Sequence, residues 1–575
     1  MKNRYIDALT TWERIETLRK KHLFLETDTI FLDRWHHMRG LSSMVDLEFL
    51  LKLRGMSLGE FAYAIKPLNK VDEKVLERSL HDHVWYIELD RILNEYAMNS
   101  NKGLQPSADL SSVIRPFLHD FAVFFEPFKN EMGQANVKIS DDVTQEVMQQ
   151  LALMLSNIVV KVVSVDFTAV KTDAEIQGVD EKYLKERYGT QEQLHQFYAD
   201  YPVMTRLLTE RLITFKDWVK KGFLSLIEQS EAIKEEFNVQ IVGNVMREVE
   251  WDVDLVQDGV CGKVIYTFEE DQKVVYEPRH LEIERRFYEF VKWINGQMDA
   301  RSEWLALPIS TVLYQKNLTL RLLVQKGQPE SEQEVRDDYQ RLGQLAVILY
   351  LLGAHEISYE NVVARPSFLD VDVETLFQLD VALELPEKSE TAGHDAQADL
   401  HQRKPEQMSE APWWLADFKE GLRVMSDFIL DHQAAVVLKM KDCFMSEVKV
   451  RQHLKAPIHY LQLIQFMNHP NYLKEMFYLE KLLDNTLAYP YQDKRVCAFE
   501  IDAMRQGQVP RFYTELGRSD VMTARGELIA DYLDQTPFDQ VMSRLETWDV
   551  AEIETDLVEL VTRLHLWVEK GEVLG

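Results

Sequence analysis

The sequence predicts an α+β protein, mostly helical, with a bilobal core between helical N-terminal and C-terminal elaborations. Apolar residues recur at three- and four-residue spacing along most of the chain, which is typical of amphipathic helices. Residues 239–281 are instead rich in β-branched side chains, and the alternating segments 263–268 and 273–276 flank a short acidic turn, as in a β-hairpin. Residues 339–377 then read as a helix, a tight loop and a short acidic strand. This order is that of the metal- and phosphate-binding half of a kinase-type site.

The length of 575 residues exceeds what one hydrophobic core supports, so we expect several structural parts. Changes of pattern along the chain place their boundaries. The expected parts are a helical N-terminal region at 1–235, a kinase-like core at 236–382, a mobile polar loop at 383–412 and a helical C-terminal part at 413–575. The loop is polar, flanked by proline and without periodicity.

The formal net charge of −30 argues against nucleic acid as a partner, because phosphate binding needs clustered lysine and arginine. A cationic peptide or another protein suits such a surface better. The three cysteines are far apart and lack metal-ligand spacing, which excludes a disulfide scaffold and a cysteine-built zinc site. Together with a polar N-terminus that does not read as a signal peptide, this favours the reducing cytoplasm.

The apolar runs of the chain do not read as membrane spans. Residues 345–352 are too few, and residues 151–165 are interrupted by Asn157 and Lys161. We therefore expect no transmembrane segment.

Two histidine pairs invite a metal-site interpretation: His36 with His37, and His81 with His83. Adjacent histidines on a helix point to different faces, and no cysteine or carboxylate stands at ligand spacing. Ordinary structural histidines are the favoured interpretation.

The helix that opens the stretch 339–377 has a clear beginning and end. Ser331 and Glu334 form a capping-box pattern ahead of it, and Gly353 ends it. Its expected buried stripe consists of Val335, Tyr339, Leu342, Leu345, Ala346, Leu349 and Leu352.

Three carboxylates, Asp370, Asp372 and Glu374, alternate with apolar residues in the segment LDVDVETL. The two-residue period of a strand places them on one face. Oxygen ligands of this kind suit Mg²⁺, which takes one or two carboxylates together with substrate phosphates. An edge strand with a solvated acidic face is the alternative, and the segment alone does not decide between them.

Asn361, in the loop before that strand, favours the metal interpretation, since phosphoryl-transfer sites combine a metal-binding Asp with a catalytic-loop Asn and a base. At the base position the loop offers Glu356 and Ser358 in place of the expected Asp. Upstream, the strand KVVYEPRHL carries Glu277 where a kinase-like lobe would supply a lysine for the nucleotide phosphates. A carboxylate there repels a triphosphate, and Lys273, on the same face of the strand, lies well displaced from it.

The segment YQRLGQLAVILYLLGAHEISYENVVA, followed by DVDVETLF, resembles the dehydratase domain of class II lanthipeptide synthetases, the LanM type. Other segments agree with that family in order: YPVMTRLL, the hairpin GKVIYTF with KVVYEPRHL, EVKVRQHLKAPIHYLQLIQFMNHPNYL and FEIDAMRQGQVPRFYT. The resemblance runs from about Tyr201 to the C-terminus. Several ordered motifs make it more specific than any single motif would.

The resemblance implies a lipid-kinase-like core within helical additions. Family members use ATP and Mg²⁺ to phosphorylate Ser and Thr of a ribosomally made precursor peptide, and then eliminate the phosphate to leave dehydroalanine or dehydrobutyrine. A C-terminal cyclase domain then adds Cys thiols, with zinc held by two Cys and a His. This chain ends before such a domain and its cysteines lack that pattern, so we expect no zinc and no ring formation by the chain itself.

The resemblance also assigns roles to residues of the catalytic loop and acidic strand. Asn361 and Asp372 match the metal ligands of the family, and Glu374 matches the adjacent acid. Glu356 replaces the catalytic-loop Asp, and Ser358 replaces the His two positions later. A displacement of about 1 Å, such as one methylene causes, can cost on the order of a hundredfold in rate.

Two further positions of the resemblance, one for phosphate binding and one for elimination, are also replaced. Glu277 stands where the family has Lys, which reverses a charge beside the nucleotide. The G-D-x-H motif of the family falls in DLVQDGVCG, where no His is present and Asp254 and Asp258 are the available substitutes.

The elimination motif of the family is kept in part. Arg451 is retained, Lys455 stands where a second Arg is usual, and Pro457 occupies the Thr position. Losing several groups that act together leaves little basis for normal turnover.

We therefore predict a standalone LanM-type dehydratase-domain homologue that is degenerate in catalysis and binds a precursor peptide or a full-length partner synthetase. Its binding of Mg-ATP would be weakened or lost. The alternative is an active ATP- and Mg²⁺-dependent Ser/Thr kinase-dehydratase with a rearranged site at Glu356, Asn361 and Asp372. A helical interaction protein without a peptide role is a third interpretation, which the retained Asn361 and Asp372 disfavour.

Overall fold

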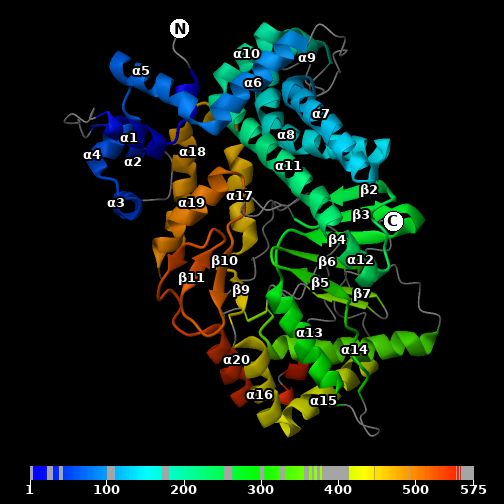
Figure 1. The fold of residues 1–575 in the computed structure, drawn as a ribbon. Coiled ribbons are helices and arrows are strands. Elements are labelled where there is room, and N and C mark those ends of the chain that lie inside the picture. The colour runs from blue at the N-terminus through cyan, green and yellow to red at the C-terminus, as the bar shows by residue number, and fades with distance from the viewer. Residues whose placement is uncertain are drawn as a thin grey trace. The chain divides into compact units, whose positions relative to one another are not determined.

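The computed structural model describes residues 4–21, 30–37, 43–99, 111–170, 181–251, 262–297, 304–323, 331–354, 362–365, 368–371, 376–377, 414–445, 447–490, 493–551, 553–555 and 557. Over these residues the chain is mostly helical, with several small sheets (Figure 1), as the α+β prediction requires. The chain divides into two compact units, both discontinuous in sequence. Unit 1 comprises Met1–Pro278 and Pro457–Pro510, and unit 2 comprises Arg279–Ala456 and Arg511–Gly575.

Several helices of unit 1 begin at a capping box, in which a hydroxyl and an acid or amide three residues later satisfy each other's backbone N–H groups. The capping residues are Thr10, Ser43, Ser57 and Thr190. The helices and 3-10 turns of the first segment are η1 (Arg4–Ala8), α1 (Thr11–Lys20), α2 (Ile30–His37), α3 (Met44–Leu53), α4 (Leu58–Ile65), α5 (Lys70–Ser79), η2 (Leu80–Asp82), α6 (Val84–Asn99), α7 (Ser111–Gln134), α8 (Asp141–Val170), α9 (Glu181–Tyr188), α10 (Gln191–Asp200), α11 (Pro202–Glu228) and α12 (Ser230–Phe237). Those of the second segment are α17 (Pro457–Met467), η7 (Pro470–Tyr472), α18 (Met476–Leu483), η8 (Asp484–Ala488), η9 (Lys494–Val496) and α19 (Cys497–Arg505).

The predicted β-hairpin is present in unit 1 and belongs to a small sheet. Its strands are β3 (Val264–Phe268) and β4 (Lys273–Glu277), which pair antiparallel around the acidic turn η4 (Glu269–Asp271). Strand β2 (Val245–Trp251) pairs antiparallel with β3, and the two-residue β1 (Lys138–Ile139) pairs parallel with β2. Helix α11 lies close to this sheet at Gly222, where an added Cβ would collide with the hydroxyl of Tyr266.

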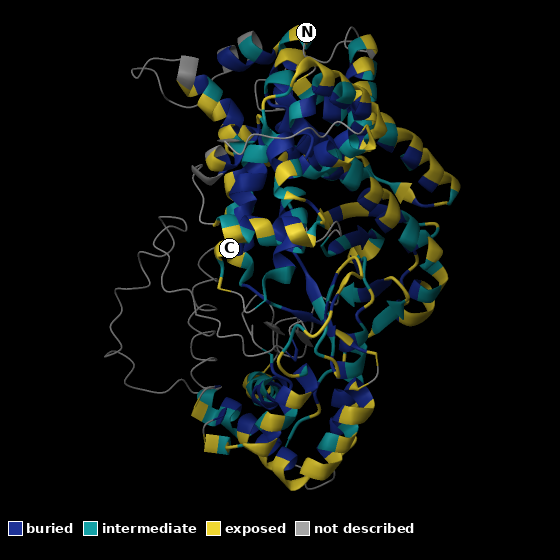
Figure 2. Ribbon diagram, turned by 90° about the vertical axis from the view of Figure 1, so that its left-hand side faces the viewer, coloured by how far each residue is buried: buried dark blue, intermediate teal, exposed yellow. Residues whose placement is uncertain are grey.

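Phenylalanines at helical spacing build the core between α7 and α11. Phe117, Phe121 and Phe125 recur every four residues on α7 and are at most 1% exposed. The ring of Phe121 packs on that of Phe215, with ring centroids 5.4 Å apart, and Phe125 packs edge-on against Phe223. Helix α7 therefore has one buried face and one exposed face, and both classes of residue are seen along the helices in Figure 2.

Helix α8 is the one described helix that is long and apolar enough to cross a membrane by length and composition alone. One of its faces is buried, with Val147, Leu151 and Leu155 at 0% exposure, and the helix packs on α7, α11 and β2. On its other side Lys161 Nζ donates a hydrogen bond of 2.8 Å to the carbonyl oxygen of Gln465. These contacts are those of a helix packed within its own unit.

Unit 2 combines helices with short strands. Its helices are α13 (Glu282–Asn295), α14 (Glu332–Leu351), α15 (Trp414–Asp431), α16 (Gln433–Phe444) and α20 (Pro537–Glu546). Its strands are β5 (Val312–Gln315), β6 (Leu318–Leu323), β7 (Val362–Arg365), β8 (Phe368–Val371), β9 (Lys449–Gln452), β10 (Phe512–Glu515), β11 (Val521–Thr523) and β12 (Leu528–Ile529). Strands β5 and β6 pair antiparallel, β7 pairs antiparallel with β8, and β9 to β12 form a four-stranded antiparallel sheet in the order β12-β11-β10-β9. The helices surround one apolar core.

The expectation of a helical C-terminal part is wrong at β9 to β12. These strands have two to four residues each, which is too short for a period of two to be recognised. Strand β6 was missed although its residues 318–322 alternate apolar and polar side chains, because the alternation spans only five residues. The predicted loop at 383–412 lies outside the described residues.

Candidate functional site

The sequence-predicted site residues are unevenly covered by the structure. Glu277 and Arg451 are described, whereas five lie outside the described residues: Glu356, Ser358, Asn361, Asp372 and Glu374. The substitutes Asp254 and Asp258 also lie outside them. The metal, base and nucleotide roles assigned to these residues therefore remain predictions. The elements that precede and follow them in the sequence are described.

Helix α14 precedes the catalytic-loop segment and has the predicted ends. The Ser331 hydroxyl accepts the backbone N–H of Glu334 at 3.2 Å, which is the Ser half of the predicted capping box. Gly353 follows the helix with φ +67°, a left-handed conformation that favours glycine. An added Cβ at Gly353 would also collide with the guanidinium of Arg544.

The predicted buried stripe of α14 is confirmed in the C-terminal half of the helix. Leu345, Ala346, Leu349 and Leu352 are buried. The residues of the N-terminal half, Val335, Tyr339 and Leu342, are only half-buried. Residues 343–349 are instead buried without interruption, so this half of the helix is enclosed on every side.

Two glycines, one on α14 and one on α15, explain that enclosure. An added Cβ at Gly343 would collide with the carbonyl oxygen of Phe418 and lie 2.9 Å from the nitrogen of Leu422. An added Cβ at Gly421 would collide with the carbonyl oxygen of Gln340. The backbones of α14 and α15 thus approach each other more closely than any side chain would allow.

The end of the stretch 339–377 is fixed to its surroundings. The Phe377 N–H donates to the carbonyl oxygen of Leu352 at 2.7 Å, and Gln452 Nε2 donates to the Phe377 carbonyl oxygen at 3.1 Å. The Phe377 ring is fully buried and packs edge-on against Phe444, with centroids 5.0 Å apart. Phe377 has φ +56°, a costly conformation for a bulky residue that these contacts hold in place. The strand pair β7–β8, which covers part of the predicted acidic strand, lies between α14 and this anchor in the sequence.

Arg451 directly precedes Gln452, the residue that bonds the Phe377 carbonyl oxygen. It is in β9, opposite Tyr513 of β10, and is 9% exposed, while Lys455 is 5% exposed. The structure therefore brings β9, the strand of Arg451, to Phe377 at the end of the stretch 339–377. Pro457 is the first residue of α17, a position that favours proline because no N–H is needed there.

Glu277 is the last residue of β4 in unit 1 and is 6% exposed. Lys273, at the other end of β4, donates to the Glu250 carboxylate of β2 at 3.1 Å. This hydrogen bond raises the pKa of Lys273. Because Lys273 is engaged on its own sheet, it does not replace the missing lysine at the position of Glu277.

A buried ion pair in unit 2 was missed by the sequence analysis. Arg321 Nη2 of β6 donates to Glu284 Oε2 of α13 at 2.8 Å, and the Tyr314 hydroxyl of β5 donates to Glu284 Oε1 at 3.0 Å. Glu284 is 2% exposed and Arg321 is 6% exposed. Burial and the Glu284 carboxylate raise the pKa of Tyr314. A strand cation held by a helix glutamate is the arrangement that protein kinases use to position their phosphate-binding lysine.

The signal that could have revealed this pair is Arg321 itself, a charge inside the apolar strand LTLRLL. A buried charge needs a partner, because desolvation without one is too costly. The partner was not recognisable, since Glu284 lies 37 residues away in the charged first turn of α13.

A family model described as a domain of unknown function (DUF4135) matches residues 201–408 and 396–515, which together make up more than half of the 575-residue chain. The match begins at Tyr201, where the resemblance of the sequence to the LanM-type dehydratase domain also begins. No curated protein matches the chain.

Proposed function

The chain belongs to the DUF4135 family, a domain found in LanM-like lanthipeptide synthetases, and we propose that it acts in lanthipeptide biosynthesis as a non-catalytic homologue of the synthetase dehydratase domain. In this role it binds a precursor peptide, or a full-length partner synthetase, without modifying the peptide. The proposal includes a lipid-kinase-like core and action in the cytoplasm.

The observation that supports this function is the buried carboxylate of Glu277. It stands at the position where the resemblance puts the phosphate-binding lysine, and it is 6% exposed. A reversed charge in a poorly solvated place is a strong obstacle to a triphosphate. Helix α14 and the contacts of Phe377, which bracket the predicted catalytic loop in the sequence, are both present.

Glu277 would repel the phosphates of a nucleotide, and the predicted metal ligands Asn361 and Asp372 lie outside the described residues. The proposal therefore assigns no step to a nucleotide or a metal.

The second candidate function is an active kinase-dehydratase with a rearranged site, and the ion pair of Arg321 with Glu284 favours it. A guanidinium on a strand, held by a helix carboxylate, could replace the lost lysine as the phosphate-facing cation. Its burial and its engagement with Glu284 and Tyr314 equally suit a purely structural pair.

One assay distinguishes the two functions. The purified chain is incubated with Mg-ATP and the precursor peptide encoded beside its gene, and the peptide is analysed by mass spectrometry. The non-catalytic proposal predicts neither the mass gain of a phosphoryl group nor the mass loss of one water. It also predicts saturable binding of the same peptide, or of the partner synthetase, by calorimetric titration.

Controls make both outcomes decisive. A full-length LanM synthetase incubated with the same peptide shows that the substrate is competent, and a scrambled precursor shows that binding is specific. Phosphorylated or dehydrated peptide produced by this chain would contradict the proposal and establish the second function. Absence of any binding to peptide or synthetase would also contradict it.

A further inference from the structure

Unit 1 contains a cavity of about 330 Å³ that is separate from the residues considered above. Its walls come from the start of α6, the middle of α11, the start of α18, and the end of α19 with the residues that follow. A volume of this size is at the small end of the range for ligand pockets.

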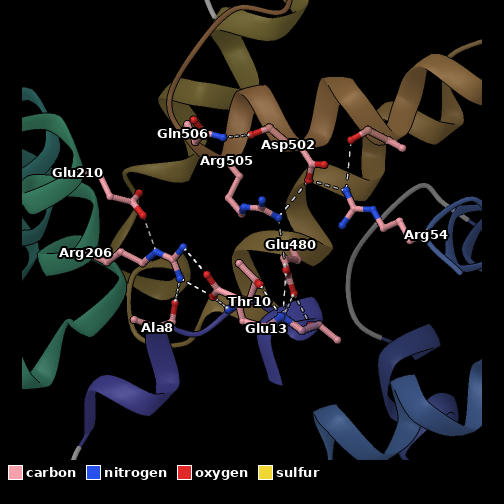
Figure 3. Close-up of polar contacts among 12 residues, drawn as sticks. Ala8, Thr10, Glu13, Arg54, Arg206, Glu210, Glu480, Asp502, Arg505 and Gln506 are labelled. Carbon is pink, nitrogen blue, oxygen red and sulfur yellow. Dashed lines mark hydrogen bonds and ion pairs between the residues drawn. The ribbon is translucent and has the colours of Figure 1, made fainter. Parts of the chain in front are cut away.

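Two arginines of the cavity wall are neutralised by carboxylates (Figure 3). Arg206 makes a two-pronged ion pair with Glu13, at 2.7 and 2.9 Å, and donates from Nε to Glu210 at 2.8 Å. Burial alone would raise the pKa of Glu13, but the bonds to Arg206 outweigh it and lower the pKa to about 2. Arg505 forms an ion pair with Asp502 at 3.2 Å.

Arg211 also lines the cavity and differs from these two. Its Nη2 donates long hydrogen bonds to the carbonyl oxygens of Gln506 and Gly507, at 3.3 and 3.4 Å. Among the described residues no carboxylate lies within ion-pair distance of it. Burial lowers the pKa of Arg211 to about 10, and the guanidinium still carries its charge at neutral pH. Arg211 is therefore the arginine of the wall that no direct ion pair engages among the described residues, although the nearby Glu210 carboxylate acts against the lowering of its pKa.

Two further polar atoms of the wall lack a hydrogen-bond partner within the described part of the chain. They are Oε1 of Gln508, which is 5% exposed, and Nε1 of Trp85, which is 4% exposed. The indole of Trp85 is held in place by Arg206, whose guanidinium lies 5.2 Å from its ring centroid. Buried polar atoms are nearly always satisfied, so an acceptor and a donor left open in one cavity indicate a ligand that supplies both partners.

The rest of the wall defines the shape of that ligand. Val84, Leu207, Ile213 and Met476 supply apolar surface. The Glu210 carboxylate also lines the cavity and disfavours a dianion such as phosphate. The net charge of −30 further disfavours a polyanion.

We infer that this cavity binds a monocarboxylate that carries an adjacent amide N–H and an apolar side chain. The carboxylate pairs with Arg211 and accepts the Trp85 N–H, the amide N–H donates to Gln508, and the side chain lies against the apolar wall. Both the C-terminal residue of a peptide and a free N-acylated amino acid present this chemistry.

The inference is tested by calorimetric titration of the full chain with N-acetyl-L-leucine, its uncharged amide N-acetyl-L-leucinamide, and the peptide N-acetyl-Ala-Ala-Leu. We expect N-acetyl-L-leucine to bind and its amide to bind about tenfold or more weakly, because the amide lacks the carboxylate that pairs with Arg211. Arg211→Gln weakens binding of the acid by a similar factor and leaves the amide unaffected. If N-acetyl-Ala-Ala-Leu binds much more tightly than N-acetyl-L-leucine, the natural ligand is the C-terminus of a peptide. If N-acetyl-L-leucine binds more tightly, the natural ligand is a free N-acylated amino acid.

Matched variants separate binding from folding. Arg247→Gln, which removes an exposed guanidinium of β2, leaves binding unchanged. Gly507→Ala places a Cβ 2.6 Å from Arg211 Nη2. It therefore weakens binding of the acid while the Arg211 guanidinium keeps its charge. Equal binding of acid and amide, full binding by Arg211→Gln, or no binding of either acid at millimolar concentration overturns the inference. The assay contains no nucleotide and no precursor peptide, so its failure is distinct from failure of the proposed function.

Discussion

Asp484, in η8, is a buried carboxyl group whose surroundings do not compensate its charge. It is 4% exposed, and burial raises its pKa from the ordinary value of 3.8 to about 7. The nearby cations Lys481 and Arg54 lower that pKa and Glu480 raises it, and the net effect of these neighbours does not overcome desolvation. Lys481 is itself buried, and burial lowers its own pKa.

This residue gives a pH-dependent prediction for stability. Because the pKa is higher in the folded state, the folded protein binds the proton more tightly, and that contribution is complete below about pH 4 and is lost as the pH rises to about 7. We expect Asp484→Asn to be more stable than the natural protein at pH 8, by on the order of a few kcal/mol, and about equally stable at pH 4. Urea unfolding of both proteins across this range measures the difference.

The exposed Asp217 provides the control, since Asp217→Asn in the same unit is expected to show no such pH-dependent difference. An Asp484→Asn difference that is the same at pH 4 and pH 8 would show that folding does not raise the pKa of this carboxyl group.

For single residues, the sequence predicted positions within a local element but not contacts between distant elements. The position of Glu277 in the hairpin was correct, because alternation fixes which residues share a strand. That Arg321 faces Glu284, and that Arg211, Gln508 and Trp85 share one cavity, could not be predicted, because these residues lie on elements far apart in the sequence.

At the scale of elements, the contact between α14 and α15 depends on glycine. We expect Gly421→Ala to destabilise the protein by several kcal/mol, because its Cβ meets the backbone carbonyl of Gln340, which cannot move without separating the helices. Elsewhere in a helix the same exchange is stabilising by about 0.5–1 kcal/mol. Thermal and urea unfolding measure the loss.

Gly133 in α7 is the matched control, because nothing lies within 4 Å of its added Cβ. Gly133→Ala should leave stability unchanged or raise it slightly. If Gly421→Ala were as harmless as Gly133→Ala, the close approach of α14 and α15 would be wrong.

The elements that the sequence predicted well are those with explicit end signals. Ser331 and Gly353 bracket α14, and the acidic turn separates β3 from β4. The pairing of β9 with β10 has no such local signal, because it joins residues 449–452 to residues 512–515 across more than fifty positions. Tertiary pairing, not local pattern, creates that sheet.

For the whole molecule, the units are discontinuous, so sequence order is a poor guide to what packs together. Residues 457–510 belong to unit 1, although residues 279–456 before them belong to unit 2. The family match from 201 to 515 runs across both units. The central claim, that this family member keeps the frame of a dehydratase domain without its nucleotide chemistry, therefore concerns the chain as a whole.

Titration of the full chain with Mg-ATP tests that claim most directly, with Glu277→Lys to restore the family residue and Glu277→Gln to remove the charge alone. Circular dichroism confirms that each variant is folded. We expect no saturable binding to the natural protein, little gain from Glu277→Gln, and measurable binding by Glu277→Lys, since only the lysine adds attraction for the phosphates. Tight binding of Mg-ATP by the natural protein that Glu277→Lys weakens would contradict the account.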